Sequence, residues 1–170
     1  IAAGEVVERP ASAVKELALR RGLRVEQPLN ASSQETVDLM RMLGARAYIV
    51  ASFGQILKPP LLGGISGINV HASLLPRYRG AAPIERAVMN GEPETGGSIM
   101  DIVKELDAGG IYLRRTVAIE EEDDAGSIYQ KLAVVGGEAL AQVLDQLELG
   151  KIEPQAQDDT LATYAEKITT

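Results

Sequence analysis

The amino-acid sequence predicts an α/β fold, in which helices and strands alternate along the chain and pack in layers. Segments with helical periodicity alternate with short apolar runs of strand length, of which Ala47–Ala51 is the clearest. The 170 residues are 45% hydrophobic and 24% charged, which are ordinary values for one globular domain with its own core. These two observations favour a single layered domain over a disordered or fibrous chain.

The amino-terminal part of the chain is expected to hold two helices and one strand. Pro10 stands in the first turn of a helical pattern that runs to residue 19 and ends at Gly22. Residues 25–28 form a short extended piece. Ser33 is a suitable cap for a second helix, which Gly44 closes. The apolar run at residues 47–51 then fits a buried parallel strand.

The remaining elements follow after a segment broken by prolines and glycines. We expect strands at residues 67–71, 96–103 and 111–119, and helices at residues 83–89 and 127–149. The long helix contains Gly136 and Gly137, each of which costs roughly 1 kcal/mol relative to alanine, so we expect close packing or a bend there. The acidic run at residues 120–124 is interpreted as a solvated loop and helix cap. The polar tail after residue 150 has no strong period.

Composition excludes several classes of function. The absence of cysteine removes disulfides, thiolate nucleophiles and zinc–thiolate sites, and a single histidine removes a histidine-cluster metal site. No apolar run reaches the ~18–20 residues that a membrane span needs, and no export signal is evident. A net charge of −7 argues against a domain that grips nucleic acid unaided. The cytoplasm is therefore the expected compartment.

The most informative motif is a pair of polar residues at the end of a predicted strand. Asn69 and His71 are two residues apart, so a strand directs both side chains to the same face. Asn can donate a hydrogen bond to a developing oxyanion, and His can move a proton near neutral pH. Asp107, in a glycine-rich loop between two strands, offers a carboxylate to orient the imidazole.

The residues alone leave structural alternatives open. A lone histidine at a strand end is commonly structural, and an aspartate before Ala-Gly-Gly is commonly a turn residue. Arg77 and Arg79 are by default solvated surface charges. Taken by themselves, the residues support an α/β domain with a candidate polar site.

From about residue 14 onward, the sequence resembles methionyl-tRNA formyltransferase. The resemblance is carried by five segments in the family's order: residues 14–18 (VKELA), 53–57 (FGQIL), 68–84 (INVHASLLPRYRGAAPI), 106–109 (LDAG) and 157–168 (QDDTLATYAEKI). It implies a doubly wound, Rossmann-like formyltransferase fold with a mostly parallel sheet, here incomplete because the first β-α-β portion is missing. Residues 14–152 would be the catalytic core, and residues 153–170 a tail or linker toward an absent carboxy-terminal barrel domain.

The family resemblance also implies a reaction and a site. A formyl group would pass from 10-formyltetrahydrofolate to the amino group of methionyl-tRNA through a tetrahedral oxyanion, without a metal. Asn69 and His71 would donate hydrogen bonds to the oxyanion, and Asp107 would hold the imidazole and help to relay the proton. The residues expected to bind folate are Ser73, Leu74, Leu75, Pro76, Gln55, Ile56 and Leu57.

The first residues depart from that family. Residues 1–17 (IAAGEVVERPASAVKEL) resemble the opening helix of the MutL mismatch-repair ATPase, which suggests a foreign segment at residues 1–13 and a chimeric chain. Three hypotheses follow: a formyltransferase domain in translation initiation, a folded but catalytically impaired fragment that still contacts folate, or a strand-swapped oligomer joined through open sheet edges. The initiator tRNA is expected to bind weakly.

Overall fold

The computed structural model describes residues 11–169 and divides into two compact units, residues 1–30 and 31–170. In the first unit, α1 spans Ala13–Arg20, and the side chain of its N-cap Ser12 accepts a hydrogen bond from the backbone N–H of Lys15. The predicted helix is thus confirmed, and residues 25–28, predicted as a short extended piece, belong to no helix or strand. Residues 1–10, which make up most of the segment predicted to be MutL-like (residues 1–13), lie outside the described residues.

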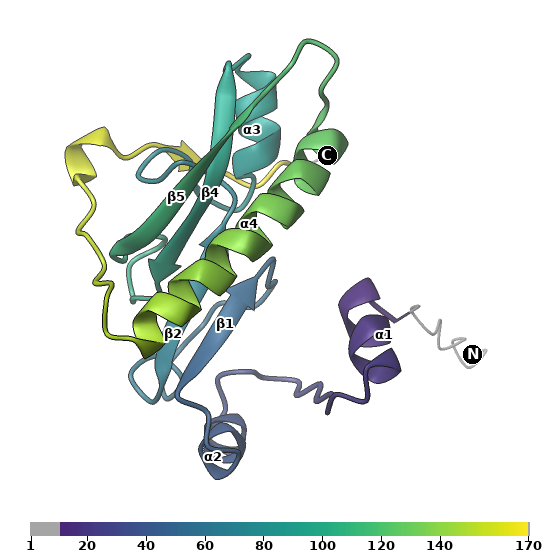
Figure 1. The fold of residues 1–170 in the computed structure, drawn as a ribbon, viewed down its shortest axis with the longest axis vertical. Helices are drawn as coiled ribbons and strands as arrows, with labels where there is room; N and C mark the ends of the chain where they lie inside the picture. Colours follow the sequence, from purple (N-terminus) through teal and green to yellow (C-terminus); the bar gives the residue numbers. More distant parts are fainter. Residues whose placement is uncertain (1–10, 170) are drawn as a thin grey trace, which may run out of the picture. The chain divides into compact units, whose positions relative to one another are not determined.

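The second unit is built on a four-stranded sheet (Figure 1). Its strands, in spatial order, are β1 (Ala47–Ala51), β2 (Ser66–His71), β4 (Glu94–Asp101) and β5 (Ile111–Ala118). β1 and β2 are parallel, whereas β4 is antiparallel to both β2 and β5. Three of the four strands, β1, β2 and β5, therefore run in one direction, as the prediction of a mostly parallel sheet requires, and β4 runs against them.

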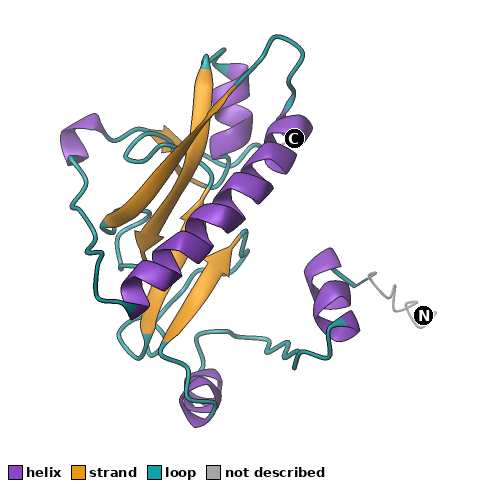
Figure 2. Cartoon of the chain, viewed as in Figure 1, coloured by secondary structure: helices purple, strands orange, loops and turns teal. Residues whose placement is uncertain are grey.

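Three helices accompany this sheet (Figure 2). They are α2 (Gln34–Met42), α3 (Pro83–Met89) and α4 (Ala125–Glu148). Ser33 caps α2 as predicted. Asp124 caps α4 through a reciprocal pair of hydrogen bonds with Ser127, which confirms that the acidic run contains a helix cap.

One face of the sheet is covered by α4, which lies across β4 and β5 (Figure 1). Its Ala139 and Val143 pack against buried Ile68 and Ile99. Gly136 also lies against this face, because a Cβ built there would stand 3.1 Å from a methyl group of Val70. Close packing therefore explains one glycine of the predicted pair.

The opposite face of the sheet carries the candidate site. Residues alternate between faces along a strand, so Asn69 and His71 lie opposite Ile68 and Val70, on the face that α4 does not cover. On that face Leu75, from the loop after β2, packs against Met100 and Ile111. The candidate site therefore lies on the face opposite α4, where the loop after β2 packs against β4 and β5.

The predicted burial of residues 47–51 was wrong, although their parallel pairing is confirmed. Only Tyr48 of this strand is buried, and 40% of Ile49 is exposed. Within residues 11–169, β1 pairs with β2 alone, so it forms an edge of the sheet. An edge strand has one fewer neighbour to cover its side chains, which accounts for the exposure.

The tail after α4 returns to the sheet. Gln155 forms a backbone bridge with Ile111, and β6 (Tyr164–Ala165) pairs with β3 (Arg79–Gly80), just after a short 3₁₀ helix at Asp159–Leu161. The described part of the predicted linker is therefore attached to the core. Within residues 11–169, no helix is both long and apolar enough to cross a membrane.

Candidate active site

His71 and Asp107 come together beyond the carboxyl end of β2, where α/β sheets usually bind ligands. The Nδ1 atom of His71 lies 3.7 Å from Oδ2 of Asp107, and only 6% and 14% of the two side chains are exposed. This distance suits an ion pair but exceeds hydrogen-bond length. The structure thus brings together the predicted imidazole and carboxylate, although they lie 36 positions apart in the sequence.

The second ring nitrogen of His71 has its own partner. Nε2 lies 2.9 Å from the carbonyl oxygen of Tyr78, and because a carbonyl only accepts, Nε2 carries the hydrogen. Nδ1 is therefore the nitrogen that can meet a substrate. The Tyr78 carbonyl fixes the rotation of the ring and leaves this nitrogen toward Asp107.

Tyr78 is itself firmly held. Its φ angle of 60° lies in the left-handed region, which is sparsely populated by residues other than glycine. Its hydroxyl donates to Glu92 and accepts from Asn90. Burial and the Glu92 contact raise the pKa of Tyr78, and the same hydrogen bond lowers the pKa of Glu92. The phenol therefore stays protonated and anchors the backbone whose carbonyl orients His71.

Asp107 is held by both its backbone and its side chain. Its φ angle of 48° places it in the left-handed region, in a turn between β4 and β5. Its Oδ2 accepts a hydrogen bond of 2.7 Å from the backbone N–H of Gly80. Gly80 must be glycine here, because its φ is 118° and a Cβ would stand 2.7 Å from the carbonyl oxygen of Ala165. The carboxylate is thus fixed beside the imidazole.

Asn69 lies one pleat before His71 on the same face of β2 and is partly exposed. Among residues 11–169, the side-chain amide of Asn69 has no hydrogen-bond partner that would hold it away from His71. The amide N–H groups remain available to an oxygen placed next to His71.

The loop after β2, residues 73–76, is fastened from beneath by Ser98 of β4. The Ser98 hydroxyl donates to the carbonyl of Ser73 at 2.7 Å and accepts from the N–H of Leu75 at 3.2 Å. The guanidinium of Arg114 donates to the carbonyl of Leu75, and the N–H of Thr163 to that of Pro76. These polar groups of the loop therefore have protein partners already.

The second stretch predicted to bind folate, residues 55–57, follows β1. Because β1 and β2 are parallel neighbours, this stretch and residues 73–76 both follow the carboxyl edge of the sheet. Within residues 11–169, the backbone groups of Ile56 and Leu57 form no hydrogen bond, and Ile56 is exposed. They can therefore serve as donors and acceptors for a planar heterocycle.

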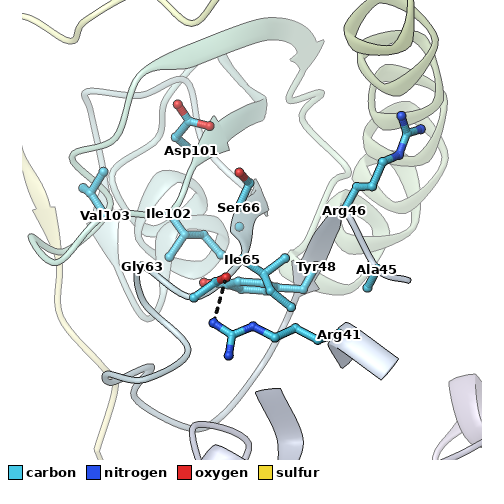
Figure 3. A pocket seen from close by; sticks show the side chains of 12 residues that line it. Arg41, Ala45, Arg46, Tyr48, Gly63, Ile65, Ser66, Asp101, Ile102 and Val103 are labelled. Carbon is cyan, nitrogen blue, oxygen red and sulfur yellow. Dashed lines mark hydrogen bonds between the residues drawn. The ribbon is translucent and has the colours of Figure 1, made fainter. Parts of the chain in front are cut away.

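A separate hollow lies elsewhere in the second unit. It measures about 610 Å³ and is lined by the beginnings of β1 and β2, with Arg41, Arg46 and Tyr48 around it (Figure 3). In Figure 3, Arg41 extends beneath Tyr48 and bonds to the backbone of Gly64. This is the amino-terminal end of the parallel strands, opposite to the end where His71 stands. Chemistry and topology therefore favour the region around His71 and Asp107 as the candidate site.

Sequence reasoning missed several residues that support the site. Arg79 was expected on the surface but is only 4% exposed, whereas Arg77 is exposed as expected. The guanidinium of Arg79 donates hydrogen bonds to the side chains of Gln157 and Asp159 in the tail. Gln157 and Ser98 were not singled out either, since isolated polar residues in a polar tail or an ordinary strand carry no local signal.

Comparisons with known proteins agree with this architecture. A family model described as formyl transferase matches residues 2–144. The methionyl-tRNA formyltransferase of Nitratidesulfovibrio vulgaris is 48% identical over 160 residues, which cover 93% of this chain and 48% of that protein.

Two solved structures show the same fold. Phosphoribosylglycinamide formyltransferase from Bacillus halodurans superposes with a TM-score of 0.73 at 25% identity, covering 82% of this chain and 76% of that one. HypX from Aquifex aeolicus, solved with tetrahydrofolic acid, gives a TM-score of 0.70 at 19% identity, covering 78% and 23%.

The chain spans about half the length of the curated relatives that it matches. The family match includes most of the segment predicted to be MutL-like, so the comparisons place no boundary near residue 14. The match covers the sheet, the loop after β2, and both His71 and Asp107. On these grounds, the chain belongs to the formyl transferase family.

Proposed function

We propose that this domain transfers a formyl group from 10-formyltetrahydrofolate to the amino group of methionyl-tRNA. The observation that carries the proposal is the geometry of His71, whose Nε2 is tied to the Tyr78 carbonyl while its Nδ1 faces Asp107 at 3.7 Å. Family membership and the methionyl-tRNA formyltransferase names of its relatives support this acceptor.

The side chains divide the chemistry among them. The folate co-substrate supplies the formyl carbon that the acceptor's neutral amine attacks. Asn69 donates an N–H to the formyl oxygen as that oxygen becomes negatively charged, and a protonated Nδ1 of His71 donates a second hydrogen bond. Asp107 stabilises the charged imidazole and helps to remove the proton that the amine loses. Transfer ends with the formyl group bonded to the acceptor nitrogen and a proton on the departing folate nitrogen.

The loops at the carboxyl edge fit a folate. The backbone groups of Ile56 and Leu57 are free to pair with the edge of a pterin. Residues 73–76 supply a rigid wall, since Ser98 and Arg114 hold their backbone. We therefore assign Ser73, Leu74, Leu75 and Pro76 to a supporting wall, and Gln55, Ile56 and Leu57 to direct contact.

The partners follow from charge and from the extent of the chain. A net charge of −7 attracts RNA poorly, so the initiator tRNA binds this domain weakly. The reaction belongs to translation initiation in the cytoplasm. We also retain two proposals from the sequence alone: that residues 1–13 have a MutL-like origin, and that residues 153–170 continue toward a barrel domain.

The decisive test substitutes the two facing side chains. His71→Ala and Asp107→Asn should each lower the rate of formyl transfer from the folate donor to methionyl-tRNA by about 10²- to 10⁴-fold. Calorimetry should show that both variants still bind a stable folate analogue. Asp145→Asn is the matched control, because this aspartate is exposed on α4. Unchanged turnover in Asp107→Asn would contradict the mechanism.

A folate-binding module without turnover is the second candidate function. It is favoured by the position of Asp107, which is beyond hydrogen-bond distance from His71. Saturable binding of the folate analogue by the unmodified chain, with no formyl transfer, would establish this alternative.

A further inference from the structure

We propose that Gln157 is a positioning residue for Asp107, so that the tail after α4 is a working part of the active site. This inference rests on the proposed function, because it assigns Gln157 a role in the same formyl transfer. Gln157 lies 50 positions after Asp107, yet its side chain contacts the backbone of the Asp107 turn directly.

The amide of Gln157 uses its donors and its acceptor at once. Nε2 donates to the backbone carbonyl of Asp107 at 2.7 Å and to that of Gly109 at 2.8 Å. Oε1 accepts from the guanidinium of Arg79, at 3.1 Å from Nε and 2.8 Å from Nη2. The two donor contacts span the turn that holds Asp107 at its left-handed φ of 48°.

These contacts close a ring around the catalytic carboxylate. Gln157 binds the backbone of Asp107, the Asp107 side chain accepts from Gly80 N–H, Gly80 follows Arg79, and Arg79 binds Gln157. A closed ring of hydrogen bonds resists rotation of the turn more than separate contacts would, because no member can move alone. The position of Asp107 beside His71 is therefore set from two sides.

Gly109 makes the turn sensitive to its supports. A Cβ at this position would stand 1.9 Å from the carbonyl oxygen of Asp101, so the turn passes directly against β4. Because the backbone is pressed against β4, a rearrangement at Gly109 has little room on that side. Loss of the Gln157 contacts would instead let the Asp107 side of the turn move, together with its carboxylate.

The tail is built to hold Gln157 in place. On one side, Gln155 exchanges two backbone hydrogen bonds with Ile111, at 2.8 and 2.9 Å. On the other side, Asp159 bonds to Arg79 at 2.6 Å. Gln157 thus projects from a segment anchored two residues before it and two residues after it.

The chemistry of this position requires an amide. A glutamate would keep the acceptor for Arg79 but would turn a carboxylate oxygen toward two carbonyl oxygens, with no hydrogen to share. Gln157→Glu therefore separates two roles: it preserves the attachment of the tail to Arg79 and removes the support of the Asp107 turn. Gln155→Glu is the matched control, because the Gln155 side chain is exposed and only its backbone is bonded.

The experiment compares these variants by formyl-transfer kinetics, by thermal unfolding, and by the NMR signals of the His71 ring, the only imidazole in the chain. Gln157→Glu should lower kcat by about 10- to 100-fold with little change in the KM for the folate donor, since displacements near 1 Å cost that much. At fixed pH, its His71 signals should shift in the direction seen in Asp107→Asn. Gln155→Glu should match the unmodified protein in both readouts.

The outcomes separate the two proposals. If the unmodified chain transfers no formyl group, the proposed function fails, and the His71 signals still decide the role of Gln157. His71 signals and kcat in Gln157→Glu equal to those in Gln155→Glu would overturn the positioning role, even if the variant were less stable. Should thermal unfolding show that Gln157→Glu does not fold, Gln157→Ala takes its place: it removes the support of the Asp107 turn without adding charge, together with the contact to Arg79. A kcat and His71 signals equal to those of Gln155→Glu would again overturn the positioning role.

Discussion

Ser98→Ala tests whether the loop at residues 73–76 depends on one buried hydroxyl. Ser98 is fully buried, and its Oγ serves the Ser73 carbonyl and the Leu75 N–H together. Ser73 and Leu75 are themselves 0% and 1% exposed, so water cannot replace the lost partner. The methyl group of alanine would leave one acceptor and one donor unsatisfied in the interior.

The expected magnitude follows from those two orphaned groups. Each buried polar group that loses its partner costs ~1–3 kcal/mol, so the variant should lose about 2–6 kcal/mol of unfolding free energy. Urea denaturation followed by circular dichroism measures this loss. A folate analogue should also bind less tightly, because it would have to restore order to the loop on which it rests.

The matched control is Ser66→Ala, at the exposed start of β2 in the same sheet. This serine makes no side-chain hydrogen bond with any described residue, so its removal should change stability by less than about 0.5 kcal/mol. Equal stabilities for the two variants would refute the reasoning. Such a result would mean that the loop keeps its conformation without Ser98.

Three further changes should be measurable. Lys131 donates a hydrogen bond to Asp123, which lowers the pKa of this carboxyl to about 2. The ionised carboxylate therefore stabilises the fold at pH values above its ordinary pKa of ~3.9, and this stabilisation is lost as the pH falls toward 2. In an acid titration of unfolding free energy, Asp123→Asn should lack this part of the decline. Gly137→Ala should raise the unfolding free energy by about 0.5–1 kcal/mol, because a Cβ at this position meets open space. Gly136→Ala should raise it by less, because a Cβ there lies 3.1 Å from a methyl group of Val70; calorimetry measures both changes. We also propose that the edge at β1 drives association, which light scattering should detect at high concentration and which Ile49→Lys should reduce; a clean monomer at every concentration would contradict it.

The sequence predicted the elements well because each has a local cause. Ser33 and Asp124 cap helices with their own side chains, and the apolar run at β1 has the length of a strand. Neighbours were harder to foresee. The exposure of Ile49 depends on the place of β1 at the sheet edge, which no property of residues 47–51 reveals.

The candidate site divides in the same way. Asn69 and His71 were predictable because strand alternation alone puts them on one face. Asp107 was a candidate because its glycine-rich loop lies between two strands, and the family resemblance added its role; the structure places it beside His71, with its carboxylate bonded to Gly80. The pairing depends on where two loops meet, and sequence spacing carries no information about that.

The residues that support the site, Ser98 and Gln157, could not be predicted from the sequence, because their role depends only on which groups they contact in the folded chain. Ser98 is an ordinary strand residue until its hydroxyl is seen bridging two backbone groups of another loop. Gln157 belongs to a polar tail with no period, yet it binds both sides of the catalytic turn. In this fold, the chemistry is carried by residues on β2 and its neighbouring turn, and the alignment of those residues is imposed by segments 27 to 50 positions away. A variant that removes the tail should therefore be expected to lose catalytic alignment before it loses the sheet, since the sheet pairs its strands without it.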